Sequence, residues 1–249
     1  YCLGCLKDGP SYCCNHCLQK IERFVDSCPL CGEPTAPARV CGWCLLETPF
    51  DALYIAAPYD QPVLPELLTA FKFEGVTSLA RELGSLLAPL FTNLSTPYTL
   101  IPLPLSQWRL QERGFNQSEL LARAAGAARS ARTAVGETGG AATGTPTAHS
   151  PDFTSGGAPV GCLRRQDPLL IHTNLLHRRF SFRQSKLIAS ERARNVRGTF
   201  SCPHPELVKN KTIVLLDDLY TTGATMAEAA QTLKVAGAKK VIGVALAKG

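Results

Sequence analysis

The chain has 249 residues, of which 45% are hydrophobic, and its formal net charge is +6. This length suffices for one α/β domain of ordinary size and a small second module. The sequence has no apolar stretch near the ~18 residues needed to cross a bilayer, and it does not open with a basic segment followed by an apolar core. These features exclude membrane insertion and a secretory signal within the chain, so we expect a cytoplasmic protein.

Nine of the eleven cysteines lie in the first 44 residues and define a separate module, which we assign to residues 1–48. Eight of them form four pairs with two residues between the cysteines: Cys2 and Cys5, Cys14 and Cys17, Cys28 and Cys31, Cys41 and Cys44. Each such pair presents two thiolates to one tetrahedral Zn²⁺. The sequence therefore predicts a double zinc ribbon with two structural zinc ions, which would have to stabilise a segment too short for its own core.

Other uses of these cysteines compete with zinc binding. A disulfide cluster conflicts with a cytoplasmic location, and a redox pair is a further alternative. Cys13 could replace Cys14 as a ligand, although Cys14 keeps the two-residue spacing. We expect the first four paired cysteines to share one metal and the last four the other, in preference to an interleaved arrangement. Cys162 and Cys202 have no partners at ligand spacing and are predicted to be ordinary thiols.

From Asp51 onward the sequence changes to alternating strand and helix patterns, and we assign residues 49–249 to one domain. Strands are predicted at 52–59 and 98–103, and helices at 64–73, 78–91 and about 118–132. These elements precede a further strand pattern near the end of the chain, as expected for an α/β domain.

A guanidinium group and two side-chain amides follow the second predicted strand, at Arg113, Asn116 and Gln117. These groups suit the oxygens of a pyrophosphate, which accept hydrogen bonds from guanidinium and amide donors. In the alternative, Arg113 is a surface residue and Asn116 caps the following helix, since Asn is a preferred N-cap.

Residues 134–160 consist almost entirely of Gly, Ala, Thr, Pro and Ser, with Glu137 and Asp152 as the charged residues. Such a composition buries too little apolar surface to offset the entropy of ordering, and it predicts a disordered insertion in the domain. A linker between two domains is the alternative. It is the weaker one because the residues that follow are too few for an independent α/β fold.

Residues 161–198 carry eight Arg and one Lys against two acidic residues. A segment of this kind faces a polyanion, lines an anionic ligand site or forms a solvated basic face. Two roles, direct contact with a ligand and membership of a solvated basic face, are both open for five of its arginines: Arg178, Arg179, Arg183, Arg192 and Arg197.

The chain ends with a predicted strand at 212–216, a helix at 223–235 and a strand at 241–247, a β-α-β unit that implies a parallel sheet. Asp217 and Asp218 follow the first of these strands. Two carboxylates there can accept hydrogen bonds from the vicinal hydroxyls of a ribose.

The loop that opens the helix reads Thr221-Thr222-Gly223-Ala224-Thr225. Its hydroxyls and backbone N–H groups lie at a helix N-terminus, where phosphate is favoured, and Gly223 permits close approach of the anion. An ordinary helix cap behind two acids is the alternative. The combined pattern predicts a site for a ribose 5-phosphate group.

This order of strand, acid pair, loop and helix resembles the signature of type I phosphoribosyltransferases, which use phosphoribosyl pyrophosphate (PRPP). With the cysteine pairs in front, the chain resembles the ComF family over nearly its whole length. Residues 113–117 and 195–200, with Arg192, strengthen the resemblance. Residues 178–184 look like the region before the PRPP strand of glutamine-dependent amidophosphoribosyltransferases. The insertion and Tyr220, where a smaller aliphatic residue is usual, depart from the family pattern, and neither falls on an acid or loop position.

The resemblance implies a phosphoribosyltransferase-like protein that binds PRPP with Mg²⁺ and is linked to DNA uptake in natural competence. Asp217 and Asp218 would orient the ribose, residues 221–225 would hold the 5-phosphate, and Arg113 would neutralise the departing pyrophosphate as a nucleophile attacks C1. No sequence element identifies the acceptor. In the alternative, the chain is a single-stranded DNA-binding factor of the uptake machinery whose PRPP pocket is a sensor or vestigial, with Phe180 and Phe182 as stacking candidates.

Overall fold

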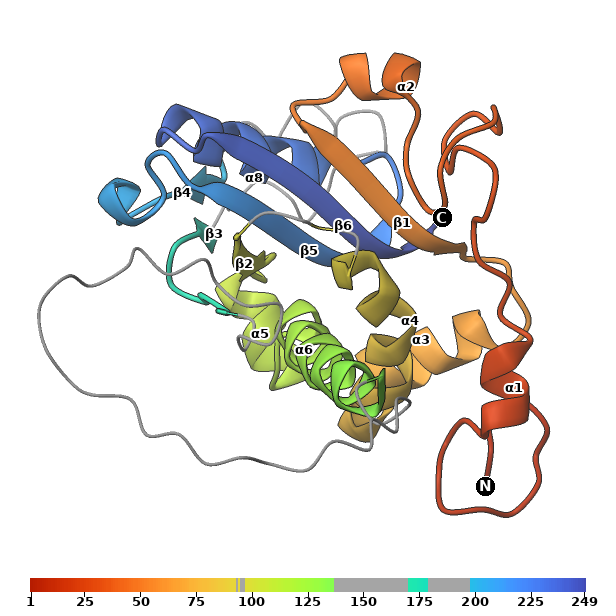
Figure 1. Ribbon diagram of the computed structural model, residues 1–249. Coiled ribbons are helices and arrows are strands. Elements are labelled where there is room, and N and C mark those ends of the chain that lie inside the picture. The colour runs from red at the N-terminus through yellow and green to blue at the C-terminus, as the bar shows by residue number, and fades with distance from the viewer. Residues whose placement is uncertain (93, 95–96, 137–169, 179–197) are drawn as a thin grey trace, which may run out of the picture.

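The computed structural model describes residues 1–92, 94, 97–136, 170–178 and 198–249. Four parallel strands form its central sheet, in the order β1-β6-β5-β2 (Figure 1). The strands are β1 (Ala52–Pro58), β2 (Thr99–Pro102), β5 (Thr212–Tyr220) and β6 (Lys240–Lys248). The parallel pairing of β5 with β6 across an intervening helix confirms the predicted β-α-β unit. The expected α/β fold with a parallel sheet is thus the one observed.

Helices cover both faces of the sheet because alternate residues of each strand point to opposite sides. Ile213 and Leu215 of β5 belong to a buried cluster that includes Ala229 and Leu233 of α8 (Ala224–Val235). Residues 214 and 216 belong to a second cluster, which includes residues of three helices: α3 (Leu64–Phe73), α4 (Ala80–Thr92) and α6 (Gln117–Gly136). A short helix, η1 (Thr77–Leu79), joins α3 to α4.

Helix α6 lies close against α4, and this contact helps to set the position of its N-terminus. A Cβ added to Gly84 of α4 would lie 2.6 Å from Cβ of Ala124 and 2.9 Å from the backbone nitrogen of Ala125. The absence of a side chain at Gly84 therefore permits the approach. The first residues of α6 are thereby held beside the carboxyl end of the sheet.

Two elements run further than the sequence predicts. Strand β5 continues to Tyr220, so the acid pair lies within the strand and not after it, because Asp217 and Leu219 stay paired with residues 245 and 247 of β6. Helix α6 continues to Gly136, so the first three residues of the predicted insertion are helical. The remainder of that insertion, residues 137–160, lies outside the described residues, as does Cys162.

The cysteine module lies along the edge of the sheet formed by β1 (Figure 1). It contains two short helices, α1 (Asn15–Gln19) and α2 (Gly42–Leu46). Val40 donates its N–H to the carbonyl of Leu53 at 2.8 Å, and Ile55 donates to Ala38 at 2.8 Å. The segment before Cys41 therefore extends the sheet by a short antiparallel bridge and shields the edge of β1.

None of the helices within the described ranges combines the length and the apolar character needed to cross a bilayer.

Candidate functional site

The eight paired cysteines form two compact clusters: Cys2, Cys5, Cys14 and Cys17, and Cys28, Cys31, Cys41 and Cys44. Within each cluster the four sulfur atoms lie within 4.8 Å of one another. Zn–S bonds of about 2.3 Å in a tetrahedron place sulfur atoms about 3.8 Å apart. The Sγ atoms of Cys5 and Cys14 lie 3.8 Å apart, and those of Cys31 and Cys41 3.6 Å apart. Each cluster fits one zinc ion, and the predicted sequential grouping is confirmed.

Both clusters have the same local structure, in which the third cysteine immediately precedes a short helix. Cys14 precedes α1 and donates its N–H to Cys2 Sγ at 3.3 Å, while Cys41 precedes α2 and donates to Cys28 Sγ at 3.3 Å. Burial raises the pKa of Cys2 and of Cys28, but the backbone N–H donors outweigh it and lower the two pKa values to about 6 and about 7. These thiols are therefore prepared for the thiolate form that a metal requires.

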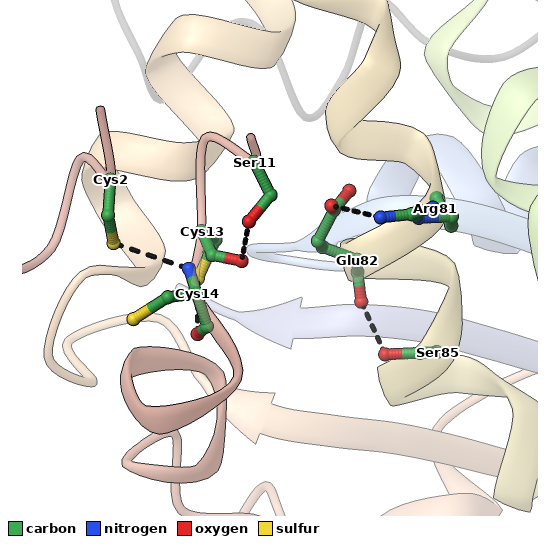
Figure 2. A network of polar contacts seen from close by, with 7 residues as sticks. All are labelled: Cys2, Ser11, Cys13, Cys14, Arg81, Glu82 and Ser85. Carbon is green, nitrogen blue, oxygen red and sulfur yellow. Dashed lines mark hydrogen bonds and ion pairs between the residues drawn. The ribbon is translucent and has the colours of Figure 1, made fainter. Parts of the chain in front are cut away.

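Cys13 lies outside both clusters, although it is adjacent to a ligand position. Figure 2 shows it beside α4, with its carbonyl accepting a hydrogen bond from the Ser11 hydroxyl at 3.1 Å. Its side chain is buried, and this burial raises the pKa of the Cys13 thiol to about 12. Cys14, and not Cys13, therefore completes the first cluster. Cys202 is likewise outside both clusters.

A cavity of about 660 Å³ opens at the carboxyl end of the sheet. Its wall includes residues 103–105 after β2, side chains of α5 (Gln107–Arg113), the end of α3, and residues 217–226 at the end of β5 and the start of α8. Ligands of open parallel sheets bind at this end of the strands, where the loops diverge. All but one of the residues predicted to bind PRPP line this cavity, Asn116 being the exception.

The two acids of the motif have different partners. The Asp217 carboxylate accepts a hydrogen bond from the Ser118 hydroxyl at 3.1 Å and from the Asp218 N–H at 2.9 Å. The Asp218 carboxylate lies 2.8 Å from the Lys72 ammonium group. Burial, followed by the negative charge of Asp218, raises the pKa of Asp217 to about 8, while Lys72 and Ser118 oppose that rise. The carboxylates are thus held at the cavity wall as a neighbouring pair.

The predicted phosphate loop, residues 221–225, joins β5 to the N-terminus of α8. Gly223 has a φ of +73° and precedes the helix, and the Ala224 N–H donates to the Thr222 hydroxyl at 3.4 Å. A Cβ at Gly223 would overlap the hydroxyl of Tyr220, which is buried beneath the loop. The departure from the family pattern at Tyr220 therefore does concern the loop, because this ring supports it from below.

The residues from the end of α5 to the start of α6 divide between the cavity and the scaffold. Arg113 donates to the Gln117 side-chain oxygen at 2.7 Å, and both residues line the cavity. Burial lowers the pKa of Arg113, and the charge of Asp218 opposes that change. The Asn116 side chain accepts from the Ser118 N–H at 3.0 Å and donates to the Leu103 carbonyl at 3.2 Å. Asn116 thus caps α6, as the alternative interpretation expected, and it sets the direction of Gln117 and Ser118.

Arg178 is the one arginine of the basic segment that the described residues include, and it lines the cavity. It lies in β3 (His177–Arg178), which pairs with β4 (Phe200–Ser201), and its guanidinium carbon lies 5.5 Å from the centre of the Phe200 ring. Glu228 of α8 accepts hydrogen bonds from the N–H and the hydroxyl of Thr199, at 2.6 and 2.7 Å. This contact ties β4, and through it Arg178, to α8. The other four arginines named above lie outside the described residues.

Sequence reasoning missed Lys72 and Ser118, although each has a detectable signal. Lys72 follows the buried Leu64 and Leu68 at intervals of four residues, and Ser118 precedes the buried Leu121 and Ala122 on α6. A polar residue at such spacing continues the buried face of its helix. It is therefore a candidate for a partner inside the fold.

Comparison with known proteins agrees with this geometry. The family model described as "Phosphoribosyl transferase domain" matches residues 174–249. The chain is 30% identical to the DNA utilization protein YhgH of Salmonella typhimurium, over 92% of this chain and 86% of that protein. It is 26% identical to Competence protein F of Haemophilus influenzae, over 97% and 92% of the two chains, and 27% identical to Competence protein ComFC of Bacillus subtilis, over 89% and 76%.

This chain has a phosphoribosyltransferase-like domain after two four-cysteine clusters, and it is similar to these relatives over most of its length. These findings together show that the chain belongs to the ComF family.

Proposed function

We propose that the chain binds PRPP and transfers its phosphoribosyl group, in a process linked to DNA uptake. One observation carries the proposal: a single cavity contains the acid pair, the phosphate loop and several cationic side chains. The link to DNA uptake is supported by the relatives, which are named for DNA utilization and for competence.

The cavity matches the three parts of PRPP. Residues 221–225 offer hydroxyls and a helix N-terminus to the 5-phosphate. Asp217 and Asp218 offer carboxylate oxygens to the ribose hydroxyls. Arg113 offers charged hydrogen-bond donors to the pyrophosphate. Mg²⁺ would enter with the ligand, since this ion is usually held by substrate phosphates together with one or two carboxylates.

In the proposed reaction the bond between C1 of the ribose and the pyrophosphate oxygen breaks, and the leaving pyrophosphate keeps the electron pair. The nucleophile supplies the electron pair of the new bond to C1 from the opposite face. The protein would act by holding the ribose in position and by balancing the charge that develops on the leaving group. Asp217, Asp218 and Arg113 are the residues to which we assign these roles.

Calorimetric titration with PRPP and Mg²⁺ tests the binding step. The combined Asp217→Asn and Asp218→Asn variant should lose most of its affinity for PRPP, because amide groups replace both carboxyl groups that would contact the ribose hydroxyls. Asp60→Asn, an exposed acid that does not line the cavity, is the matched control and should bind like the wild type. Equal affinity in the double variant and the wild type would reject the assignment of the acids, provided that circular dichroism shows both proteins folded.

Single-stranded DNA binding is the second candidate function. The observation that favours it is the pairing of an aromatic and a cationic side chain at the cavity, where the half-exposed Trp108 is followed by Arg109. Aromatic rings that stack on bases, beside cations that contact the backbone, are the usual components of single-strand sites. The salt dependence of binding tests this candidate.

A further inference from the structure

Lys72 is a largely buried cation at the cavity to which the proposed function assigns no part of the ligand. It lies in the last turn of α3, and its side chain is 13% exposed. An ammonium group at such a position needs a partner, because removing an unpaired charge from water is strongly unfavourable. Its partner is Asp218, whose side chain is 5% exposed and whose Oδ2 lies 2.8 Å from Lys72 Nζ.

A purely structural role explains this ion pair poorly. Buried ion pairs contribute little net stability, because the loss of hydration offsets most of the attraction, and apolar residues of similar volume often replace them without loss. The pair is placed at the cavity wall, where both of its members line the same space. An ammonium group has three N–H donors, and one partner leaves two of them for a ligand oxygen.

The surroundings of Lys72 suit an anion with several charges. The next residue, Phe73, carries the Arg113 guanidinium group over its ring at 5.3 Å, and Arg113 also lies in the electrostatic field of Asp218. Two cations from the ends of α3 and α5 thus lie near the acid that would hold the ribose. The phosphate loop belongs to a different part of the wall, at the start of α8.

We propose that Lys72 is a ligand-contacting residue, whose ammonium group bridges the Asp218 carboxylate and the pyrophosphate of PRPP. The inference rests on the proposed binding of PRPP. If the loop holds the 5-phosphate and the acids hold the ribose, the pyrophosphate on C1 is the part of the ligand that remains for Lys72 and Arg113. Lys72 would then act on the leaving group, and its ion pair with Asp218 would fix the position of its own ammonium group.

The experiment compares two ligands, PRPP and ribose 5-phosphate, which differ by the pyrophosphate group. Lys72→Met should lower the affinity for PRPP by about 10- to 100-fold, the usual range for a lost charged hydrogen bond. The affinity for ribose 5-phosphate should change by less than about threefold. Lys239→Met, at an exposed lysine that does not line the cavity, is the control and should bind both ligands like the wild type.

Three results separate the inference from the proposal on which it rests. A wild-type protein that binds neither ligand would overturn the proposed function and the inference together. Unchanged PRPP affinity in Lys72→Met, or an equal loss for both ligands, would overturn the inference alone and leave Lys72 without a role or as a counter-ion of Asp218. Lys72→Gln, which keeps donors toward Asp218 without the charge, repeats the comparison if Lys72→Met does not fold.

Discussion

At the scale of single residues, the two acids of the motif are not equivalent. Within the described residues, no cation lies at contact distance from the Asp217 carboxyl group. Its hydrogen-bond partners are the Ser118 hydroxyl and the Asp218 backbone N–H. Asp218 has the Lys72 ammonium group at 2.8 Å. The same substitution at the two positions should therefore change stability in opposite directions, although both would weaken a ribose contact.

We expect Asp217→Asn to raise the free energy of unfolding at pH 8 by about 1–3 kcal/mol. The raised pKa of Asp217, about 8, means that the folded protein holds a proton that the unfolded chain releases near pH 4. The stability that this group confers is complete below pH 4 and is lost as the pH rises to about 8. Thermal melts from pH 4 to 8 should show that the variant's gain in melting temperature over the wild type grows with pH, because asparagine does not titrate. The asparagine oxygen can still accept both hydrogen bonds.

Asp218→Asn is the matched comparison, and we expect it to lower the free energy of unfolding by roughly 3 kcal/mol because it leaves the largely buried Lys72 ammonium group without its counter-ion. The same direction of change in both variants would contradict the difference in surroundings described here.

At the scale of elements, the cysteine module is part of the sheet and not an appendage. Its Val40 and Ala38 hydrogen-bond to β1, and the Phe24 N–H donates to the Ala56 carbonyl at 3.2 Å. Cysteines of both clusters also belong to the two buried clusters that flank the sheet. Zinc in the module would therefore stabilise an edge of the larger domain.

Removal of zinc with a strong chelator should accordingly unfold more than residues 1–48. Hydrogen exchange should accelerate at the amides of Val40 and Ile55, which bond across the junction, while Val214 in central β5 stays protected. Mass spectrometry of the exchanged protein measures this difference, and metal analysis before chelation should find close to two zinc ions per chain. Unchanged protection at Ile55 after complete loss of metal would show that β1 keeps its edge without the module.

At the scale of the whole molecule, the positive charge is uneven. The net charge of +6 for the whole chain is smaller than the net positive charge of residues 161–198 alone, so the remainder of the chain is close to neutral. Such a concentration of arginine favours one polyanionic partner over general attraction to anions. Arg178 belongs to the cavity, which leaves Arg179 and Arg183 as the neighbouring positions for a test of DNA binding.

If the chain binds single-stranded DNA, a plot of log affinity against log salt should have a slope of roughly −2 to −3.5, as three to five phosphate contacts imply. Arg179→Glu with Arg183→Glu should flatten the slope by about 1.4 and weaken binding to every sequence alike. Lys239→Glu with Lys240→Glu changes the net charge equally at exposed positions and should have less effect. Fluorescence anisotropy measures the affinities, and no binding even at low salt would end the DNA hypothesis.

The sequence by itself determined the features that depend on neighbouring residues. The spacing within each cysteine pair is local, and so is the order of strand, acids, loop and helix at residues 212–235. Hydrophobic periodicity located the parallel strands because buried strands of this kind are almost continuously apolar. The two zinc-type clusters and the main parts of the candidate site followed from such patterns, as the structure bears out for the clusters.

Only the tertiary structure decided what depends on residues distant in the chain. Ser118 and Asp217 are 99 residues apart in the sequence, and Lys72 and Asp218 come from α3 and β5. No local pattern specifies such a contact, because it depends on how helices pack across a sheet. The same holds for Asn116, which caps a helix instead of lining the cavity, and for Tyr220 beneath Gly223. Packing decided which of several chemically suitable side chains reach the cavity.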